Sequence, residues 1–165
     1  MININGNIFD YIKTGNGVCI PTNGIVKGDG NAVMGAGLAL SFAQKYNNLP
    51  KRLGGFLTKY KNNKPYILGA VNNDSFFIPK KEDFNNCCLI FSFPTKNHYK
   101  NDSDLFLIEN SCIELVRYCN DFNLNNIYLP KPGVGLGKLN YSDVEPILSK
   151  YLDNRFYIIN FNNEK

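Results

Sequence analysis

The chain has 165 residues, of which 44% are hydrophobic and 19% charged, and this composition fits one soluble globular domain with a full core. Lysine and arginine number 18 against 14 aspartate and glutamate residues, which gives a formal net charge of +4. A mild positive excess favours ligands that carry phosphate. It is smaller than the charge expected of a dedicated nucleic-acid-binding protein.

The cysteine and histidine content bounds the cellular setting and the metal chemistry. Five cysteines occur without a CxxC pair, and their odd number predicts reduced thiols in a cytoplasmic protein. The single histidine argues against a His-based zinc site, and we expect no metal and no other cofactor. The sequence shows no signal peptide and no apolar stretch of membrane-spanning length, so no membrane association is expected.

The first part of the chain predicts two strands followed by two helices. INING at 2–6 and VCIPT at Val18–Thr22 are short apolar runs bounded by turn residues, as is typical of strands. Apolar residues then recur with helical spacing and predict a helix over Leu38–Tyr46. A second helix is expected over Pro50–Tyr60.

The middle of the chain predicts three strands and a long amphipathic helix. PYILGAV at 65–71 and SFFIP at 75–79 are expected to be strands joined by a turn, and CCLIFSFP at Cys87–Pro94 a buried strand. Ser103 or Asp102 can cap the next helix. Its apolar face keeps a period of 3.6 residues from Leu105 to Cys119.

The last part predicts a strand, a helix and a closing strand. NIYLP at Asn126–Pro130 is a short apolar run, and Ser142 with Glu145 forms a capping box at the start of a helix, with Pro146 in its first turn. RFYII at 155–159 is the closing strand. The alternation of strands and helices, without a linker or a repeat, predicts one α/β sandwich with a mixed sheet over residues 1–165.

Two glycine-rich segments each follow a predicted strand and precede a predicted helix. They are VMGAGL at 33–38 and PGVGLG at 132–137. Such loops lie at the carboxyl ends of strands, and a helix N-terminus offers unpaired N–H groups to an anion. The pair predicts a ligand whose phosphates are held from two sides. For either loop alone, a tight turn without a ligand is the alternative interpretation.

The glycine spacing argues against two common nucleotide motifs. Gly30 and Gly35 have the spacing of a P-loop, but Ala36 stands where the lysine belongs, which argues against a Walker ATPase. A dinucleotide fingerprint needs a third glycine where Leu40 stands and an acidic residue about twenty positions further on. Neither is present, so a Rossmann dehydrogenase is not expected.

Four segments in order carry a resemblance to a known family. GNIF, PTNG with VMGAGLAL, FPTKNHY and LPKPGVGLGKLNY resemble macrodomains, which bind ADP-ribose. The resemblance runs from about Asn5 to the final strand and implies a three-layer α/β/α sandwich with a mixed central sheet. Thr95-Lys96 ends a strand ahead of a helix. This pattern is similar to the branch that contains bacterial DNA ADP-ribosyl-glycohydrolase antitoxins and the animal terminal ADP-ribose protein glycohydrolase.

The resemblance implies contacts to ADP-ribose from three parts of the chain. Asn7 and Ile8 match the motif whose aspartate holds the adenine amino group, and the amide oxygen of Asn7 implies weaker adenine recognition. Asn23 matches a polar residue that faces the distal ribose. Backbone N–H groups of the loops are expected to hold the distal ribose and the diphosphate without a metal. These loop residues are Gly35, Ala36 and Gly37 in the first loop and Gly133, Val134, Gly135, Leu136 and Gly137 in the second.

Lys96 occupies the position of the lysine that attacks C1″ of the distal ribose in that branch. An amine adds to this carbon and forms a Schiff base only when it is unprotonated, which requires desolvation or nearby positive charge. The alternative is a solvated lysine at the end of a strand. We therefore expect Lys96 to be the catalytic residue, with loss of turnover in its alanine variant.

One position departs from the animal enzymes. They carry an aspartate near Gly137 that assists cleavage as an acid or base, whereas here no acid occurs in the second loop before Asp143. His98 and Asp29 are candidates for the missing proton carrier. The alternatives are a histidine that caps its loop and an aspartate that stays in solvent.

Three functions follow from these observations. The leading hypothesis is a glycohydrolase that removes ADP-ribose from modified DNA or protein. The second is a non-catalytic binder or sponge of ADP-ribose or a related NAD-derived nucleotide, and the third a phosphatase acting on ADP-ribose-1″-phosphate. The resemblance also implies a cognate ADP-ribosyltransferase toxin as a partner, and we expect a monomer.

Overall fold

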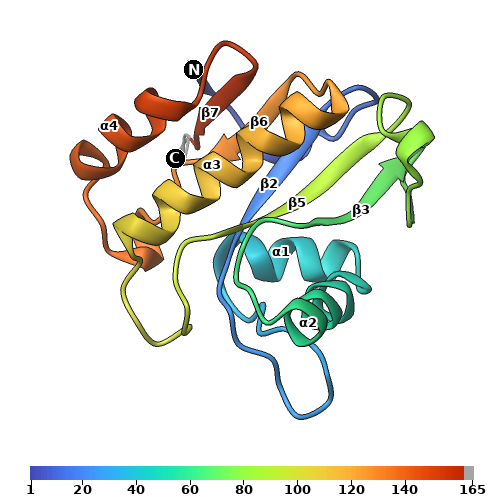
Figure 1. Cartoon of the computed structure of the whole chain (residues 1–165), viewed down its shortest axis with the longest axis horizontal. Coiled ribbons are helices and arrows are strands. Elements are labelled where there is room, and N and C mark those ends of the chain that lie inside the picture. Colours follow the sequence, from blue (N-terminus) through green and yellow to red (C-terminus); the bar gives the residue numbers. More distant parts are fainter. Residues whose placement is uncertain (162–165) are drawn as a thin grey trace.

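The computed structural model describes residues 1–161, so the end of the expected domain, residues 162–165, lies outside the described part (Figure 1). A seven-stranded sheet has the order β1-β7-β6-β2-β5-β3-β4. The first five strands in this order pair in parallel, and β3 and β4 are antiparallel. The strands are β1 Ile2–Asn5, β2 Gly17–Thr22, β3 Ile67–Asn72, β4 Ser75–Phe77, β5 Cys88–Pro94, β6 Ile127–Pro130 and β7 Phe156–Asn160.

Helices cover both faces of the sheet, and each face has its own apolar core. Helices α1 and α2 pack on one face through Phe42, Leu49 and Leu53, and α3 and α4 on the other through Leu115 and Leu148. The expected three-layer α/β/α sandwich with a mixed sheet is therefore confirmed. The helices are α1 Gly37–Lys45, α2 Leu49–Tyr60, α3 Leu105–Phe122 and α4 Tyr141–Tyr151, with short 3-10 helices η1 Ile8–Tyr11, η2 Lys81–Asp83 and η3 Gly135–Gly137.

Strand β5 lies at the centre of both cores. Phe91 and Phe93 face the α3 side, and Cys88 and Ile90 face the α1 side, so the strand is buried on both sides, with Ser92 as its polar residue. The parallel register of β2 and β5 pairs Thr22 with Pro94. Both strands therefore end at one edge of the sheet, and the residues that follow them lie side by side.

Two expected helix caps are wrong. Helix α3 is capped by Asp104, whose Oδ1 accepts hydrogen bonds from the N–H groups of Phe106 (2.8 Å) and Leu107 (3.4 Å), and not by Ser103 or Asp102. Ser103 donates its backbone N–H to the carbonyl of Gly137 instead. This bond draws Ser103 away from the helix and toward the second glycine-rich loop.

The start of α4 also differs from expectation. The helix begins at Tyr141 with Asn140 as its N-cap, so Ser142 lies inside the first turn and forms no capping box with Glu145. Pro146 is inside the helix and not in its first turn. None of the helices in residues 1–161 combines the length and the apolar character that crossing a membrane requires.

Candidate functional site

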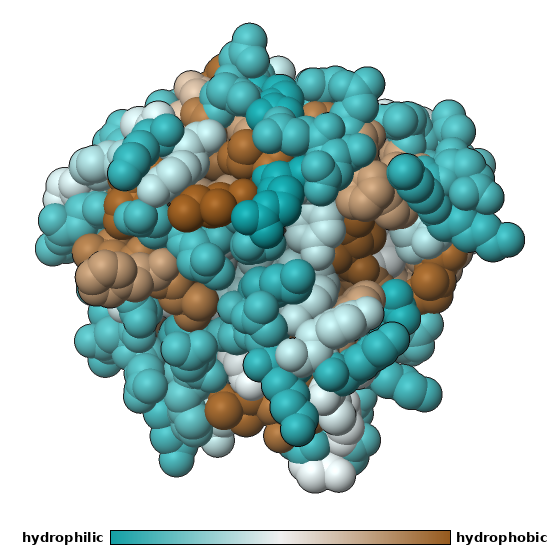
Figure 2. Space-filling model, viewed as in Figure 1, coloured by the Kyte–Doolittle hydropathy of each residue, from teal (hydrophilic) through white to brown (hydrophobic). Residues whose placement is uncertain are grey.

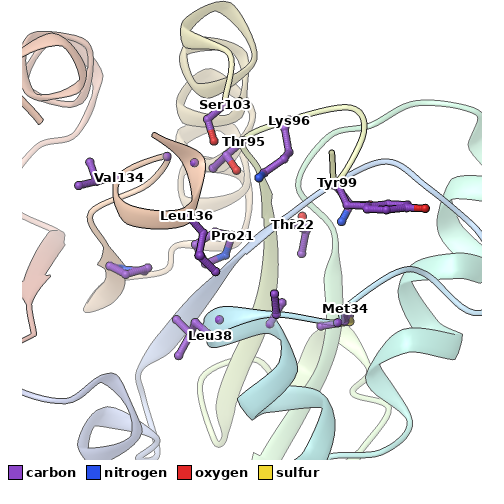
Figure 3. Close-up of a pocket in the computed structure, with 18 of the residues that line it drawn as sticks. Pro21, Thr22, Met34, Leu38, Thr95, Lys96, Tyr99, Ser103, Val134 and Leu136 are labelled. Carbon is purple, nitrogen blue, oxygen red and sulfur yellow. The ribbon is translucent and has the colours of Figure 1, made fainter. Parts of the chain in front are cut away.

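A pocket of about 520 Å³ opens at the edge where β2, β5 and β6 end (Figure 3). Its wall comes from four segments that are distant in the sequence. They are the end of β2 at 21–23, the first glycine-rich loop with the start of α1 at 33–39, the segment after β5 around Lys96, and the second glycine-rich loop after β6. The parallel strand order brings these segments together, as the rule for open α/β sheets predicts.

The first loop presents the N-terminus of α1 to the pocket. Ala36 is the N-cap in an extended conformation, and no side chain accepts a hydrogen bond from the first turn. Ala36, Gly37 and Leu38 all line the pocket. The N–H groups of an uncapped first turn, together with the positive end of the helix dipole, are suited to binding an anion.

Asn23 ties the first loop together at its base. Its Nδ2 donates to the carbonyl of Val33 and its Oδ1 accepts from the N–H of Ile25, each at 3.0 Å. Asn23 lines the pocket, but both polar atoms of its side chain already have partners among the residues that follow it, so its contact with the distal ribose stays a prediction. The observed bonds make Asn23 a residue that positions the first loop.

The second loop forms another part of the pocket wall. Gly133 and Gly135 both have φ of +77°, in the left-handed region that favours glycine. The N–H of Leu139 donates a hydrogen bond to the carbonyl of Gly133 at 3.0 Å, which closes the loop. A Cβ at Gly133 would also lie 2.8 Å from Cδ1 of Ile108, so a side chain at this position is disfavoured on two grounds.

Lys96 follows β5 directly, and its half-buried side chain points into the pocket (Figure 3). Three hydrogen bonds hold the backbone around it. The carbonyl of Lys96 accepts from Nδ2 of Asn63 (3.1 Å), the N–H of Thr95 donates to Thr22 (3.0 Å), and the carbonyl of Thr95 accepts from Asp104 (2.8 Å). No carboxylate in residues 1–161 lies within ion-pair distance of the Lys96 amine.

Two buried hydroxyl groups in the wall have no partner in the described part of the chain. They are Oγ1 of Thr22 and Oγ of Ser103, whose residues are only 5% and 7% exposed. A buried hydroxyl without a partner destabilises a fold by about 1–3 kcal/mol. Oxygen atoms of a bound ligand would satisfy both groups.

Sequence reasoning missed Thr22, Ser103 and the 45% exposed Tyr99, which also lines the pocket. The Tyr99 ring stacks on His98 with centroids 4.4 Å apart. Thr22 had a local signal, because it ends a predicted strand beside Asn23. Ser103 and Tyr99 had none, since loop packing alone brings them to the wall.

Neither candidate for the missing proton carrier reaches the wall. Nδ1 of His98 accepts from the N–H of Lys100 at 3.1 Å, which matches the loop-capping alternative. Asp29 lies in the exposed part of the first loop, where the hydrogen bond from the N–H of Asn31 lowers its pKa. The described lining of the pocket contains no aspartate and no glutamate.

Most residues predicted to bind the ligand surround this one pocket. Asn7, Ile8 and Gly135 are not in its wall. Asn7 is exposed and caps η1 by accepting from the N–H of Phe9 at 3.0 Å, and Ile8 is buried in the core on the α1 side, so their adenine role stays a prediction. The predicted residues in the wall are Asn23, Gly35, Ala36, Gly37, Lys96, Gly133, Val134, Leu136 and Gly137.

The structure describes no site for a metal. Within residues 1–161, no group of three or more histidine, cysteine, aspartate or glutamate side chains could hold an ion. The pocket wall offers backbone N–H groups, hydroxyls and two lysines, Lys96 and Lys131. This set of groups suits an anionic ligand that carries hydroxyls.

Curated relatives were found by sequence, although no protein-family model matches the chain. The chain is 32% identical over 113 residues to the DNA ADP-ribosyl glycohydrolase of Mycobacterium tuberculosis, covering 68% of this chain and 30% of that protein. It is 31% identical over 93 residues to a DNA ADP-ribosyl transferase–DNA ADP-ribosyl glycohydrolase fusion protein of Thermosipho africanus, covering 54% and 24%. The chain thus spans about a third of the length of the glycohydrolases it matches.

Solved structures show the same fold. Thermosipho africanus DarTG in complex with ADP-ribose superposes with a TM-score of 0.76 at 23% identity, covering 99% of this chain and 42% of that one. The macrodomain of Mycobacterium tuberculosis DarG superposes with a TM-score of 0.71 at 22% identity, covering 96% and 95%. At these identities the likeness concerns the fold.

Proposed function

Because this chain is a macrodomain, we propose that its pocket binds ADP-ribose and that Lys96 catalyses the removal of ADP-ribose from modified DNA. The observation that carries the proposal is the position of Lys96, whose side chain enters the pocket between the two glycine-rich loops. The choice of DNA is supported by the sequence relatives, which are named DNA ADP-ribosyl glycohydrolases.

The pocket wall supports a definite pose for the ligand. The N-terminus of α1 and the second loop, which approach each other at Gly37 and Leu136, offer backbone N–H groups to the two phosphates. The distal ribose would then lie toward Lys96, within the part of the wall that also contains Thr22 and Ser103. Their unpartnered hydroxyls would bond to ribose or phosphate oxygens.

The proposed reaction proceeds through a covalent lysine adduct. The unprotonated Nζ of Lys96 attacks C1″, and the bond from C1″ to the DNA breaks. The proton lost by the lysine nitrogen balances the proton gained by the leaving atom. Opening of the ribose ring gives a Schiff base, and addition of water releases ADP-ribose and restores the amine. One water is consumed for each ADP-ribose released.

A transferase that attaches ADP-ribose to DNA is the proposed partner of this activity. The fusion protein of Thermosipho africanus carries both activities in its name, which supports a functional pairing of the two. Such a partner would supply the substrate of this chain. The proposal also implies that the protein acts in the same compartment as the transferase and its DNA substrate.

Release of ADP-ribose from an ADP-ribosylated oligonucleotide tests the proposed function. The wild type is expected to release it, and Lys96→Ala to lose turnover by a factor of at least about 100 while still binding ADP-ribose in calorimetry. Lys100→Ala is the matched control, because Lys100 is an exposed lysine in the same segment outside the pocket wall. Equal turnover of Lys96→Ala and wild type would exclude the lysine mechanism.

A binding module is the second candidate function, and one observation favours it. The described lining contains no carboxylate to transfer a proton during cleavage. Tight ADP-ribose binding, with no release from modified DNA or modified protein, would support this candidate over the glycohydrolase. The same calorimetry and release assays therefore distinguish the two.

A further inference from the structure

The positive charge of the chain is concentrated in one segment. Residues 30–73 contain six lysine and arginine residues and no acidic residue. The rest of the chain holds 12 cations and 14 acids, so this segment supplies the whole net positive charge. The six cations are Lys45, Lys51, Arg52, Lys59, Lys61 and Lys64.

The structure gathers part of this charge in a groove beside α2. The groove has a volume of about 510 Å³, and its charged side chains are Lys51, Arg52 and Lys59. Phe56, Tyr60 and Ile78 are its apolar side chains, and we call these six residues the α2 groove. None of the six cations of residues 30–73 forms a salt bridge with another described residue. Their charge is available to an external anion.

Aromatic rings accompany the cations in the α2 groove. Phe56 stacks on the buried Tyr66 at 4.9 Å, and the Tyr60 ring lies 6.2 Å from Phe56 and 6.0 Å from Tyr66, so the three rings form one cluster. Tyr60 is 52% exposed, so the cluster is open to solvent at this ring. The guanidinium of Arg52 lies 5.0 Å from the Phe56 ring and the Lys59 amine 5.2 Å from the Tyr60 ring.

Helix α2 and the residues just after it contact two of the segments that lead into the pocket. At Gly54 the helix packs directly against the carbonyl of Gly30 in the first loop, and the carbonyl of Pro50 accepts from the N–H of Ala32 at 2.8 Å. Just beyond α2, Asn63 donates to the carbonyl of Lys96 at 3.1 Å. The segment that follows α2 therefore contacts the backbone of the proposed catalytic residue.

We propose that the α2 groove binds the single-stranded nucleic acid from which Lys96 removes ADP-ribose. Unpaired cations track phosphates, and exposed aromatic rings next to cations stack with unpaired bases. An acidic peptide would use the cations but not the open ring of Tyr60, and a duplex keeps its bases stacked inside. The face of the molecule in Figure 2 is mostly hydrophilic, with hydrophobic residues in small groups.

This proposal rests on the proposed function only for the claim that the bound nucleic-acid strand is the substrate. Binding of the strand itself requires no ADP-ribose. An unmodified, fluorescently labelled oligothymidine of about 15 nucleotides is therefore the probe, because single-stranded sites span about 4–16 nucleotides. Fluorescence anisotropy at low and physiological salt measures its affinity.

The variants are chosen so that charge and position are separated. Lys51→Glu/Lys59→Glu is expected to weaken oligothymidine binding at least about tenfold and to flatten its salt dependence. Tyr60→Ala is expected to weaken binding about fivefold or more through lost stacking. Lys59→Glu alone should also weaken binding, and Lys150→Glu, which changes the net charge by the same amount, is its matched control and should bind like wild type. Lys150 is also exposed in the last turn of its helix, with its amine 5.2 Å from the Tyr151 ring.

Calorimetry with free ADP-ribose on the same proteins keeps the two claims apart. Weaker oligothymidine binding with retained ADP-ribose binding in Lys51→Glu/Lys59→Glu supports the α2 groove. Equal oligothymidine affinity of this variant and Lys150→Glu would overturn it, as would tighter binding of a polyglutamate peptide than of oligothymidine. If the wild type did not bind ADP-ribose, that result would instead contradict the proposed function.

Discussion

Gly137 and Ser103 lie in such close contact that a Cβ at position 137 would meet the hydroxyl of Ser103 and lie 3.1 Å from its Cβ. The backbone N–H of Ser103 donates to the carbonyl of Gly137 at 2.9 Å, which fixes the two residues together. Position 137 therefore has no room for an aspartate of the kind that the animal enzymes carry nearby. Ser103 occupies the space of that side chain.

Gly137→Ala is expected to destabilise the protein by about 1–3 kcal/mol, because the new methyl group overlaps Ser103. The free energy of unfolding in denaturant measures the effect. In a Ser103→Gly background the same change should destabilise less, and the difference is the coupling between the two positions. Equal destabilisation in both backgrounds would show that the overlap is relieved elsewhere.

Ser103→Ala is expected to leave the stability of the free protein unchanged or slightly higher, because the buried hydroxyl has no described partner to lose. Its affinity for ADP-ribose should fall by about 0.5–1.5 kcal/mol if the ligand satisfies that hydroxyl. Denaturant unfolding and calorimetry measure the two effects.

Ser111→Ala is the matched control, since its buried hydroxyl donates to the carbonyl of Pro94 at 2.8 Å. It should lose stability by about 1–3 kcal/mol. A large loss of stability in Ser103→Ala, with unchanged ADP-ribose affinity, would mean that Ser103 serves only the fold.

Asn63→Ala tests the support beneath Lys96. Nδ2 of Asn63 bonds to the carbonyl of Lys96 at 3.1 Å and to Oδ1 of Asn97 at 3.0 Å, so its loss should let the segment that carries Lys96 move. We expect turnover to fall about tenfold or more with a smaller change in ADP-ribose affinity. Asn16→Ala, which removes a similar side-chain bond to the carbonyl of Tyr11, should retain turnover.

The thiols are expected to be nearly unreactive in the folded protein. All five cysteines are buried, and burial raises the pKa of Cys88, Cys112 and Cys119 to about 12. The thiolate fraction of such a group at pH 8 is about one in ten thousand. Alkylation by iodoacetamide should therefore be slow in buffer and complete in denaturant. Rapid labelling of one cysteine in buffer would contradict the described packing.

The features that could be predicted from the sequence are those with a local signal. Glycine, proline and apolar runs mark the strand ends, so the two loops were expected at one edge of the sheet, where the structure places them, whereas Lys96 was expected in the site from the family resemblance. Long-range contacts have no such signal. The bond from Ser103 to Gly137 brings Ser103 into the pocket wall and leaves Asp104 to cap α3.

The distribution of charge could likewise be predicted only in part from the sequence. The formal net charge of +4 predicted no extensive basic surface, because the sum hides an acidic remainder. The helical path of α2 is what aligns Lys51, Arg52 and Lys59 in one groove. The adenine contact predicted for Asn7 and Ile8 rests on resemblance alone, since neither residue lines the described pocket.

The most direct test of the covalent step at Lys96 is borohydride trapping of the reacting protein, followed by peptide mass spectrometry. With ADP-ribosylated single-stranded DNA as substrate, reduction of the Schiff base should leave an ADP-ribosyl adduct on the peptide that contains Lys96. Lys100→Ala should give the same adduct, and Lys96→Ala none. Release of ADP-ribose by the wild type without any adduct, or with the adduct on another residue, would contradict the account.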